Sequence, residues 1–295
     1  MSGTDLLVRP SHPSEDNYNS VLSCLKLESK SPDEQIASLT TMPAMDLLSI
    51  PPSVHFGPVI DSDIVHSPPS YTSISTSQPP LPATSWLSSL TIGDTAYDGS
   101  ILFLALGGRS NIAASFRDSL IRSLGASTYT KISKIYNLDS STDDASAQPQ
   151  IQRFGNDVAS YAPTIAYATH FHTAGVKTFV YRFNATNPWD GPLKGTSNHI
   201  LDIAFLFQNY NEFLEGTHRD VAEGFGERML AFVAGKEPWA PWKEGGEALL
   251  VGDSHVAVGR DVEPDNGRRQ GIADLAAEVG WQKLEDTWGA FVSGK

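Results

Sequence analysis

The segment Lys177–Phe183 (KTFVYRF) is the strongest β-strand pattern in the chain, and it constrains the fold most. It combines β-branched and aromatic residues between turn signals. A long helical pattern over 151–173 precedes it, and Pro163 should kink or divide that helix. A shorter helical pattern over 200–207 follows the strand and is apolar on every side, which predicts a helix buried nearly all round. Strands that alternate with helices favour the α/β class.

Further elements are predicted on both sides of this strand. Trp86–Ile92 predicts a second strand, stopped by Gly93. A hairpin is expected from Ala248–Val251 and His255–Val258, joined by Gly252-Asp253-Ser254. Helical periodicity predicts helices over 100–106, 112–124, 220–234 and 266–279.

Residues 1–85 differ in composition from the rest of the chain, since they are rich in Pro, Ser and Thr. Thr72–Gln78 is predicted to be a flexible loop. Two short helical patterns, over 19–27 and 33–40, could not be stable alone in water. We therefore expect a partly irregular region over 1–85 and the folded α/β part over 86–295.

Composition excludes several classes of protein. The 295 residues suffice for one large or two small domains. A formal net charge of −13 argues against nucleic acid or an anionic membrane surface as a partner. No apolar stretch reaches the length of about eighteen residues that a membrane-spanning helix needs. Residues 1–17 carry no apolar run after a basic region, so no secretory signal is evident there and the compartment stays open.

His199 and Asp98 are the first candidate functional residues. His199 opens the apolar run over 199–207 and follows a loop rich in Gly and Pro over 187–192. Asp98 lies in the tight turn Gly93–Gly99, after the second predicted strand. A carboxylate that orients a histidine provides two members of a nucleophilic triad. Residue types alone leave a structural role open for both, because Asp–Gly turns and loop histidines are common.

Other candidates are weaker. Ser254 sits in a Gly-Asp-Ser-His turn that joins two strands, whereas a nucleophile elbow joins a strand to a helix. Ser110 lies where one helical pattern ends and the next begins. His170 and His172 do not share a helix face and have no evident third ligand, so no metal site is predicted. The remaining candidates are assigned structural roles: His218 and Asp220 at a helix start, and the single cysteine, Cys24, as a small core residue.

Five blocks of the chain carry motif patterns: Phe56–Asp61, Gly93–Gly99, Asn156–Pro163, His199–Phe207 and Phe232–Trp242. In order and spacing they resemble the type-B carboxylesterase family of α/β-hydrolases, which includes the cholinesterases and the fungal lipases. The second block resembles the family's Gly-x-x-x-x-Glu/Asp-Gly acid motif. The fourth resembles its His-Gly-x-Glu/Asp-Ile-x-Phe-Val-Phe motif.

The resemblance implies the C-terminal part of an α/β-hydrolase fold, with an incomplete central sheet flanked by helices. It implies Asp98 as the triad acid and His199 as the triad base, with no cofactor and no metal. The implied reaction is hydrolysis of a carboxylic ester through an acyl-enzyme. Two departures stand out: Ile200 replaces the glycine that usually follows the histidine, and Asp98 is one methylene shorter than the common glutamate.

The sequence contains neither a Gly-x-Ser-x-Gly nucleophile elbow nor the family's glycine-rich oxyanion loop. Three interpretations stay open: the C-terminal part of a type-B carboxylesterase that is inactive alone, a serine-less pseudo-hydrolase that acts as a binding or interaction module, or a structural α/β protein with a coincidental resemblance. The expected partners are an ester or other apolar small molecule, together with a missing N-terminal half or self-association through an exposed sheet edge.

Overall fold

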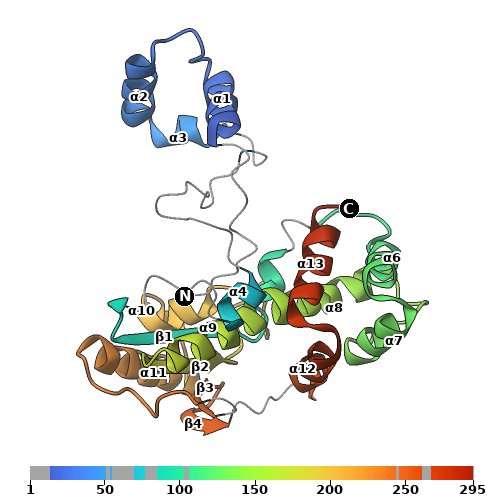
Figure 1. Ribbon diagram of the computed structural model, residues 1–295. Coiled ribbons are helices and arrows are strands. Elements are labelled where there is room, and N and C mark those ends of the chain that lie inside the picture. The colour runs from blue at the N-terminus through green and yellow to red at the C-terminus, as the bar shows by residue number, and fades with distance from the viewer. Residues whose placement is uncertain are drawn as a thin grey trace. The chain divides into compact units, whose positions relative to one another are not determined.

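The computed structural model describes residues 14–50, 54, 70–76, 85–102, 106–243, 246–260 and 267–294. The chain divides into two compact units, Asp5–Pro69 and Ser70–Lys295 (Figure 1). The expected division at residue 85 stays a prediction. The block Phe56–Asp61, which contributed to the family resemblance, lies outside the described residues.

The described part of the first unit contains three short helices, α1 (Ser14–Leu25), α2 (Pro32–Thr41) and α3 (Ala44–Leu47). The start of α2 is fixed by a capping box, in which the Ser31 backbone N–H donates to the Glu34 carboxylate at 2.9 Å. Both predicted helices are therefore present. The prediction for Cys24 is wrong: the thiol is exposed and lies 3.4 Å from the Ser49 carbonyl oxygen, because α1 buries Leu22 on its other side.

The described residues of the second unit form a four-stranded sheet in the order β1-β2-β3-β4. The strands are β1 (Ser89–Thr95), β2 (Lys177–Phe183), β3 (Glu247–Val251) and β4 (Val256–Arg260). β1, β2 and β3 run parallel, and β4 pairs antiparallel with β3. The strand predicted at β2 and the predicted β3–β4 hairpin are confirmed.

Gly93 does not stop β1, as the sequence suggested; the strand runs through it to Thr95. A Cβ at Gly93 would lie 2.5 Å from the side chain and the carbonyl oxygen of Tyr181 on β2. The glycine is therefore needed for close approach of two neighbouring strands. Trp86, the expected first residue of the strand, precedes it and is exposed.

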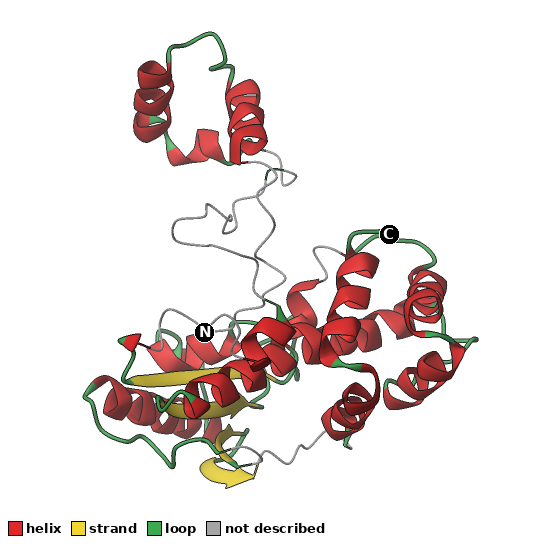
Figure 2. Cartoon of the chain, viewed as in Figure 1, coloured by secondary structure: helices red, strands yellow, loops and turns green. Residues whose placement is uncertain are grey.

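Helices cover both faces of the sheet (Figure 2). On one face, Phe179, Tyr181 and Phe183 of β2 pack against α10 (Leu201–Phe207) and α11 (Thr217–Val233). On the other face, Val180 packs with Ala168 of α9 (Ala162–Thr173). This alternation makes β2 the centre of a three-layer core.

The burial of α10 differs from the prediction. Leu201 and Phe205 are buried, whereas Ile203 is 43% exposed and Phe207 is 65% exposed. The expectation of a helix buried nearly all round is therefore wrong. Leu201 and Phe205 join the core cluster of β2 and α11, so only one side of α10 has a partner among the described residues. In α11 the predicted inner face is confirmed at Ala222 and Phe225 but not at its last residue, Val233, which is exposed.

A second group of helices lies beside the sheet (Figure 1). It comprises the 3₁₀ helix η3 (Asp98–Leu102), α6 (Ile112–Leu124), α7 (Ala126–Ile135), α8 (Asp144–Asn156), α12 (Arg268–Val279) and α13 (Trp281–Val292). Phe116 contacts both Phe154 and Phe291 edge to face in its core. α6 confirms its predicted bounds, whereas α7 and α13 had no counterpart among the predicted helices. Of the helix predicted over 100–106, residues 100–102 belong to the short η3, residue 106 is helical, and 103–105 lie outside the described residues.

Two predictions about connecting segments have different outcomes. The helix expected over 151–173 is divided, since a π-helical turn over Asp157–Tyr161 (η4) separates α8 from α9 and Pro163 lies in the first turn of α9. The loop expected over 72–78 is wrong where it is described: Tyr71–Thr76 form the helix α4. Ile74 is fully buried there, because α4 packs against α9.

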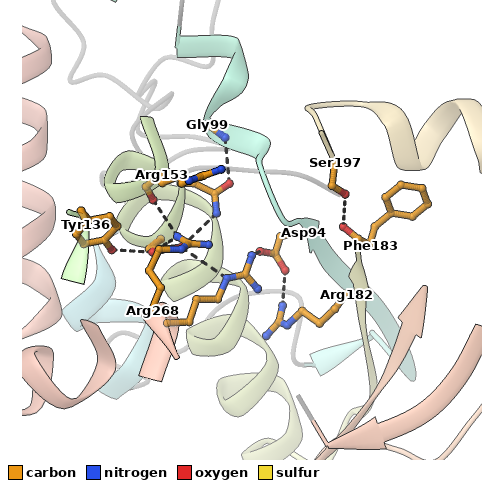
Figure 3. A network of polar contacts seen from close by, with 11 residues as sticks. Asp94, Gly99, Tyr136, Arg153, Arg182, Phe183, Ser197 and Arg268 are labelled. Atoms are coloured by element: carbon orange, nitrogen blue, oxygen red, sulfur yellow. Dashed lines mark hydrogen bonds and ion pairs between the residues drawn. The ribbon is translucent and has the colours of Figure 1, made fainter. Parts of the chain in front are cut away.

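A buried ionic network connects the sheet to the second helix group (Figure 3). Asp94 on β1 accepts a hydrogen bond from Arg182 on β2 at 2.5 Å and one from Arg269 on α12 at 2.8 Å. The Tyr161 ring lies close to both guanidinium groups, at 4.8 and 4.5 Å. Nearby, Asp157 pairs with Arg268 and accepts a hydrogen bond from the Tyr136 hydroxyl at 2.6 Å.

Removing the shared carboxylate should be costly. Asp94→Ala removes the carboxylate that the buried guanidinium groups of Arg182 and Arg269 share, so we expect the free energy of unfolding to fall by about 3–5 kcal/mol. Arg117→Ala, which breaks an exposed pair with Asp118, is the control and should change it by less than about 1 kcal/mol. Urea denaturation followed by tryptophan fluorescence measures both, and equal effects would contradict the assignment.

Candidate active site

Asp98 and His199 lie in direct contact although 101 residues separate them in the chain. The distance between Oδ1 of Asp98 and Nδ1 of His199 is 2.5 Å. The Asp98 side chain is 3% exposed, and that of His199 is 25% exposed. A buried carboxylate that contacts Nδ1 leaves the other ring nitrogen, Nε2, available for proton transfer.

The pair is assembled where β1 and β2 end. Their parallel register places Thr95 opposite Phe183, so both chains leave the sheet at the same edge. The Ala96 N–H donates to the Phe183 carbonyl oxygen at 2.9 Å, and Ser197 Oγ donates to the same oxygen at 2.7 Å (Figure 3). The Tyr97 N–H donates to the Ser197 carbonyl oxygen at 2.9 Å. These hydrogen bonds hold the two loops together at the residues that precede Asp98 and His199.

The turn at Asp98 requires the glycine that follows it. The Gly99 N–H donates to Oδ1 of Asn156 on α8 at 3.0 Å. A Cβ at Gly99 would lie 2.2 Å from the Gln152 carbonyl oxygen, so no larger residue fits without movement of α8. The glycine of the Asp–Gly pair therefore lets η3 pack closely on α8 and fixes the position of the carboxylate.

The histidine backbone is held from the same side. The His199 N–H donates to Ser100 Oγ at 3.0 Å, and the Asn198 side-chain amide donates to the His199 carbonyl oxygen at 3.1 Å. Ser100 therefore contacts the backbone of His199, while Asp98 contacts its ring. The sequence did not identify Ser100 or Asn156 as part of the site, because only the fold brings η3 and α8 against this loop.

Charge around the ring favours the protonated imidazole. The hydrogen bond that Nδ1 of His199 donates to Asp98 raises the pKa of His199 above its ordinary value of 6.5, against the lowering effect of burial. The charges of Asp98 and Asp202 raise this pKa further. Asp202 itself is buried and accepts a hydrogen bond from the Tyr181 hydroxyl at 2.8 Å. Burial raises the pKa of Asp202, and burial together with the neighbouring carboxylate raises that of Tyr181 well above 10.

Ile200 adopts the left-handed backbone conformation, with φ of 60°. β-Branched residues rarely tolerate a positive φ, whereas glycine adopts it without strain. This is the position at which the resembling family usually has glycine. The backbone of the histidine loop is therefore locally strained at Ile200.

The other sequence candidates lie apart from this pair. Ser254 Oγ lies 3.3 Å from Nδ1 of the neighbouring His255, in the exposed turn between β3 and β4. His170 is buried and contacts the Ile74 carbonyl oxygen at 3.0 Å, whereas His172 is exposed. Three further candidates take the structural places expected of them: Ser110 lies in the turn before α6, and His218 and Asp220 lie in the first turn of α11.

Within the described ranges, no serine or other group hydrogen-bonds to Nε2 of His199, and no three His, Cys, Asp or Glu side chains gather as metal ligands. None of the described helices is long and apolar enough to cross a membrane.

A sheet with helices on both faces, an acid after one strand and a histidine after the next define an α/β-hydrolase fold. The chain is similar to a solved PNB esterase, with 18% identity over 90% of this chain and 55% of that one and a TM-score of 0.57. It is also similar to the carboxylesterase EST55 of Geobacillus stearothermophilus, with 19% identity, the same coverage and a TM-score of 0.60.

Residues 8–240 match the sequence model of the carboxylesterase family, and the chain belongs to that family. It spans about 55% of the length of the esterase structures that it matches. A search of curated proteins found no match. The family and the fold that the sequence blocks implied are therefore confirmed, while the roles of Asp98 and His199 stay a prediction.

The strain at Ile200 gives a testable consequence. Ile200→Gly removes the cost of a left-handed β-branched residue, so we expect the free energy of unfolding to rise by about 1 kcal/mol. Ile203→Gly, in the helix three residues later, is the matched control and should lower it by about 1 kcal/mol. A loss of stability in Ile200→Gly, measured by urea denaturation, would show that the side chain is needed there.

The contact between Asp98 and His199 also predicts a pH dependence. Because the pKa of His199 is raised in the folded chain, the pair stabilises the fold fully below pH 6.5 and loses this contribution as the pH rises through the raised pKa. Asp98→Asn should lower the pKa of His199, and Asp202→Asn should lower it by less. Imidazole chemical shifts in an NMR titration measure both, and a larger effect of Asp202→Asn would contradict the assignment.

Proposed function

We propose that this chain supplies the acid and the base of a carboxylic ester hydrolase. The observation that carries the proposal is the 2.5 Å contact between Asp98 and Nδ1 of His199, in a chain that belongs to the carboxylesterase family. Nε2 of His199 would take the proton of a serine hydroxyl as the serine oxygen attacks the ester carbonyl carbon. The imidazolium would then return that proton to the leaving alkoxide, with Asp98 stabilising the charged ring.

The nucleophile and the oxyanion donors would come from polypeptide outside these 295 residues. Two observations support this: no Gly-x-Ser-x-Gly occurs in the sequence, and the chain spans about 55% of the length of the matched esterases. In this proposal, residues 86–295 are the C-terminal portion of the hydrolase domain and 1–85 the region upstream of the acid motif.

Two features of this chain could receive the proposed N-terminal polypeptide: exposed apolar side chains next to His199 and the outer edge of β1. Ile203 and Phe207 are exposed four residues apart, on one side of α10, and Ile200 is exposed immediately before the helix. β1 ends the described sheet, so its outer backbone groups have no strand partner there. Further strands that pair with β1 would extend the sheet at its open edge. Apolar side chains of the same polypeptide would cover the exposed side of α10. Self-association through the same edge is the competing arrangement.

The isolated chain should have no triad-dependent esterase activity, since the loss of a nucleophile lowers turnover by roughly a millionfold. Purified chain and its His199→Ala variant are compared on a short-chain p-nitrophenyl ester. We expect the two rates to be equal and at background. Turnover that His199→Ala abolishes would show that this chain contains its own nucleophile.

The proposal also requires the pair to work once a nucleophile is present. A chain extended by in-frame upstream coding sequence that contains a Gly-x-Ser-x-Gly elbow should hydrolyse the ester. His199→Ala should abolish this activity, and Asp98→Asn should lower it by roughly 10⁴-fold if the acid acts as in serine proteases. Activity that survives His199→Ala would place the base elsewhere.

The alternative is a serine-less pseudo-hydrolase that binds apolar ligands or partners. The exposed apolar side of α10 next to His199 favours it. In that case the isolated chain would be a stable monomer that binds the ester without turnover, and no upstream coding sequence would contain an elbow. Size-exclusion chromatography together with an equilibrium binding measurement on the ester distinguishes the two functions.

A further inference from the structure

A hollow of about 760 Å³ opens at the ends of β1 and β2, and neither residue of the candidate catalytic pair is among its described lining residues. Residues that follow β1 (Tyr97) and β2 (Asn184) line it, together with α7, α8 and the start of α12. Pockets that hold small molecules usually measure about 300–1,000 Å³, and open α/β sheets bind ligands at the carboxyl ends of their strands. We propose that this hollow binds a small organic anion that carries two or more negative charges.

Charge carries the proposal. Lys134 of α7, Arg153 of α8 and Arg268 of α12 line the hollow, and no Asp or Glu is among its described lining residues. The chain as a whole has a net charge of −13, so three cations around one hollow run against its overall balance. Cations gathered in a concave surface raise the local concentration of anions.

The three cations differ in how they are held. Arg268 is anchored by Asp157, so its guanidinium has a fixed position. Arg153 makes a long 3.4 Å hydrogen bond to the Gln150 amide oxygen and lies 5.7 Å from the centre of the Tyr97 ring. Lys134 makes no ion pair with any residue in the described part of the chain. Arg153 and Lys134 therefore keep N–H groups that can bind a ligand, and the position of Arg268 is already fixed.

Neutral groups complete the lining. Asn137, Gln150 and Asn184 offer amide groups, and Thr186 offers a hydroxyl. Burial raises the pKa of Tyr97, so its hydroxyl stays neutral and adds no negative charge to the hollow. Arginine forks match carboxylate and phosphate oxygens, and lysine adds a point charge. Carboxylate or phosphate groups on a small polar molecule are the chemistry that fits this set.

The hollow is separate from the candidate catalytic pair. Tyr97 and Ser197 line it, and the hydrogen bond between their backbones closes the loops at this point. Asp98 and His199 follow one and two residues later and are not among its described lining residues. The inference therefore does not depend on the proposed esterase function.

Isothermal titration calorimetry at low ionic strength tests the site with two probes, citrate for polycarboxylates and glucose 6-phosphate for phosphate esters. We expect at least one of them to bind with a stoichiometry of one. Lys134→Gln and Arg153→Gln should each weaken it by about tenfold or more, since each removes a charged donor. Lys131→Gln removes the same charge from α7 outside the hollow and should leave affinity unchanged within about twofold.

Backbone amide shifts locate the ligand independently of the variants. On saturation with the bound probe, the amides of Tyr97, Thr196 and Gly267 should shift, and those of the β3–β4 hairpin should not. Circular dichroism confirms that both variants keep the fold, which is expected because Lys134 and Arg153 are exposed. Three results would each overturn the proposal: neither probe binds, Lys131→Gln weakens binding as much as Lys134→Gln, or the shifts lie away from the hollow.

Discussion

The parallel pairing of β1 with β2 is the constraint on which the rest of the structure depends. Because Thr95 and Phe183 are opposite each other, the loops that carry Asp98 and His199 leave the sheet together. The Phe183 carbonyl oxygen accepts hydrogen bonds from both loops, so the pairing continues past the ends of the strands. The register of these two neighbouring strands therefore brings together two residues that are 101 positions apart in the sequence. Gly93 makes that register possible by allowing Tyr181 to approach.

The same two strands also contain the buried charges. Asp94 lies on β1, four residues before Asp98, and Arg182 lies on β2, immediately before Phe183. Arg269 extends the network to α12, which belongs to the same group of helices as η3 and α8. Along the chain, Asp98 therefore follows a residue of the ionic network, Asp94, and precedes Gly99, which is hydrogen-bonded to Asn156. Buried ion pairs contribute little net stability against an apolar alternative, but they tolerate only one arrangement of their partners. We infer that this network fixes geometry more than it adds stability.

Local sequence patterns predicted the elements whose cause is local. β2 has β-branched and aromatic residues along its length, α6 ends at Gly125, and the β3–β4 hairpin surrounds a Gly-Asp-Ser turn; each was predicted from those features. The failures have non-local causes. Gly93 was predicted to stop the strand, but it is needed inside the strand because Tyr181 lies so close. Cys24 was predicted to be a core residue, but α1 buries the side that carries Leu22. Helix α10 is apolar all round, so periodicity could not select the buried side; contact with the core of β2 and α11 selected it.

Motif resemblance identified Asp98 and His199, but not the contacts that position them. Those contacts also account for the strain at Ile200. On one side the His199 N–H is bonded to Ser100, and on the other Asp202 is bonded to Tyr181. The chain must turn sharply between these two anchors, and residue 200 takes the left-handed conformation as a result. The conformation thus follows from the anchors and not from the side chain at 200, which is why glycine suits this position. Asp202 acts twice in this arrangement, since it also raises the pKa of His199 through its charge.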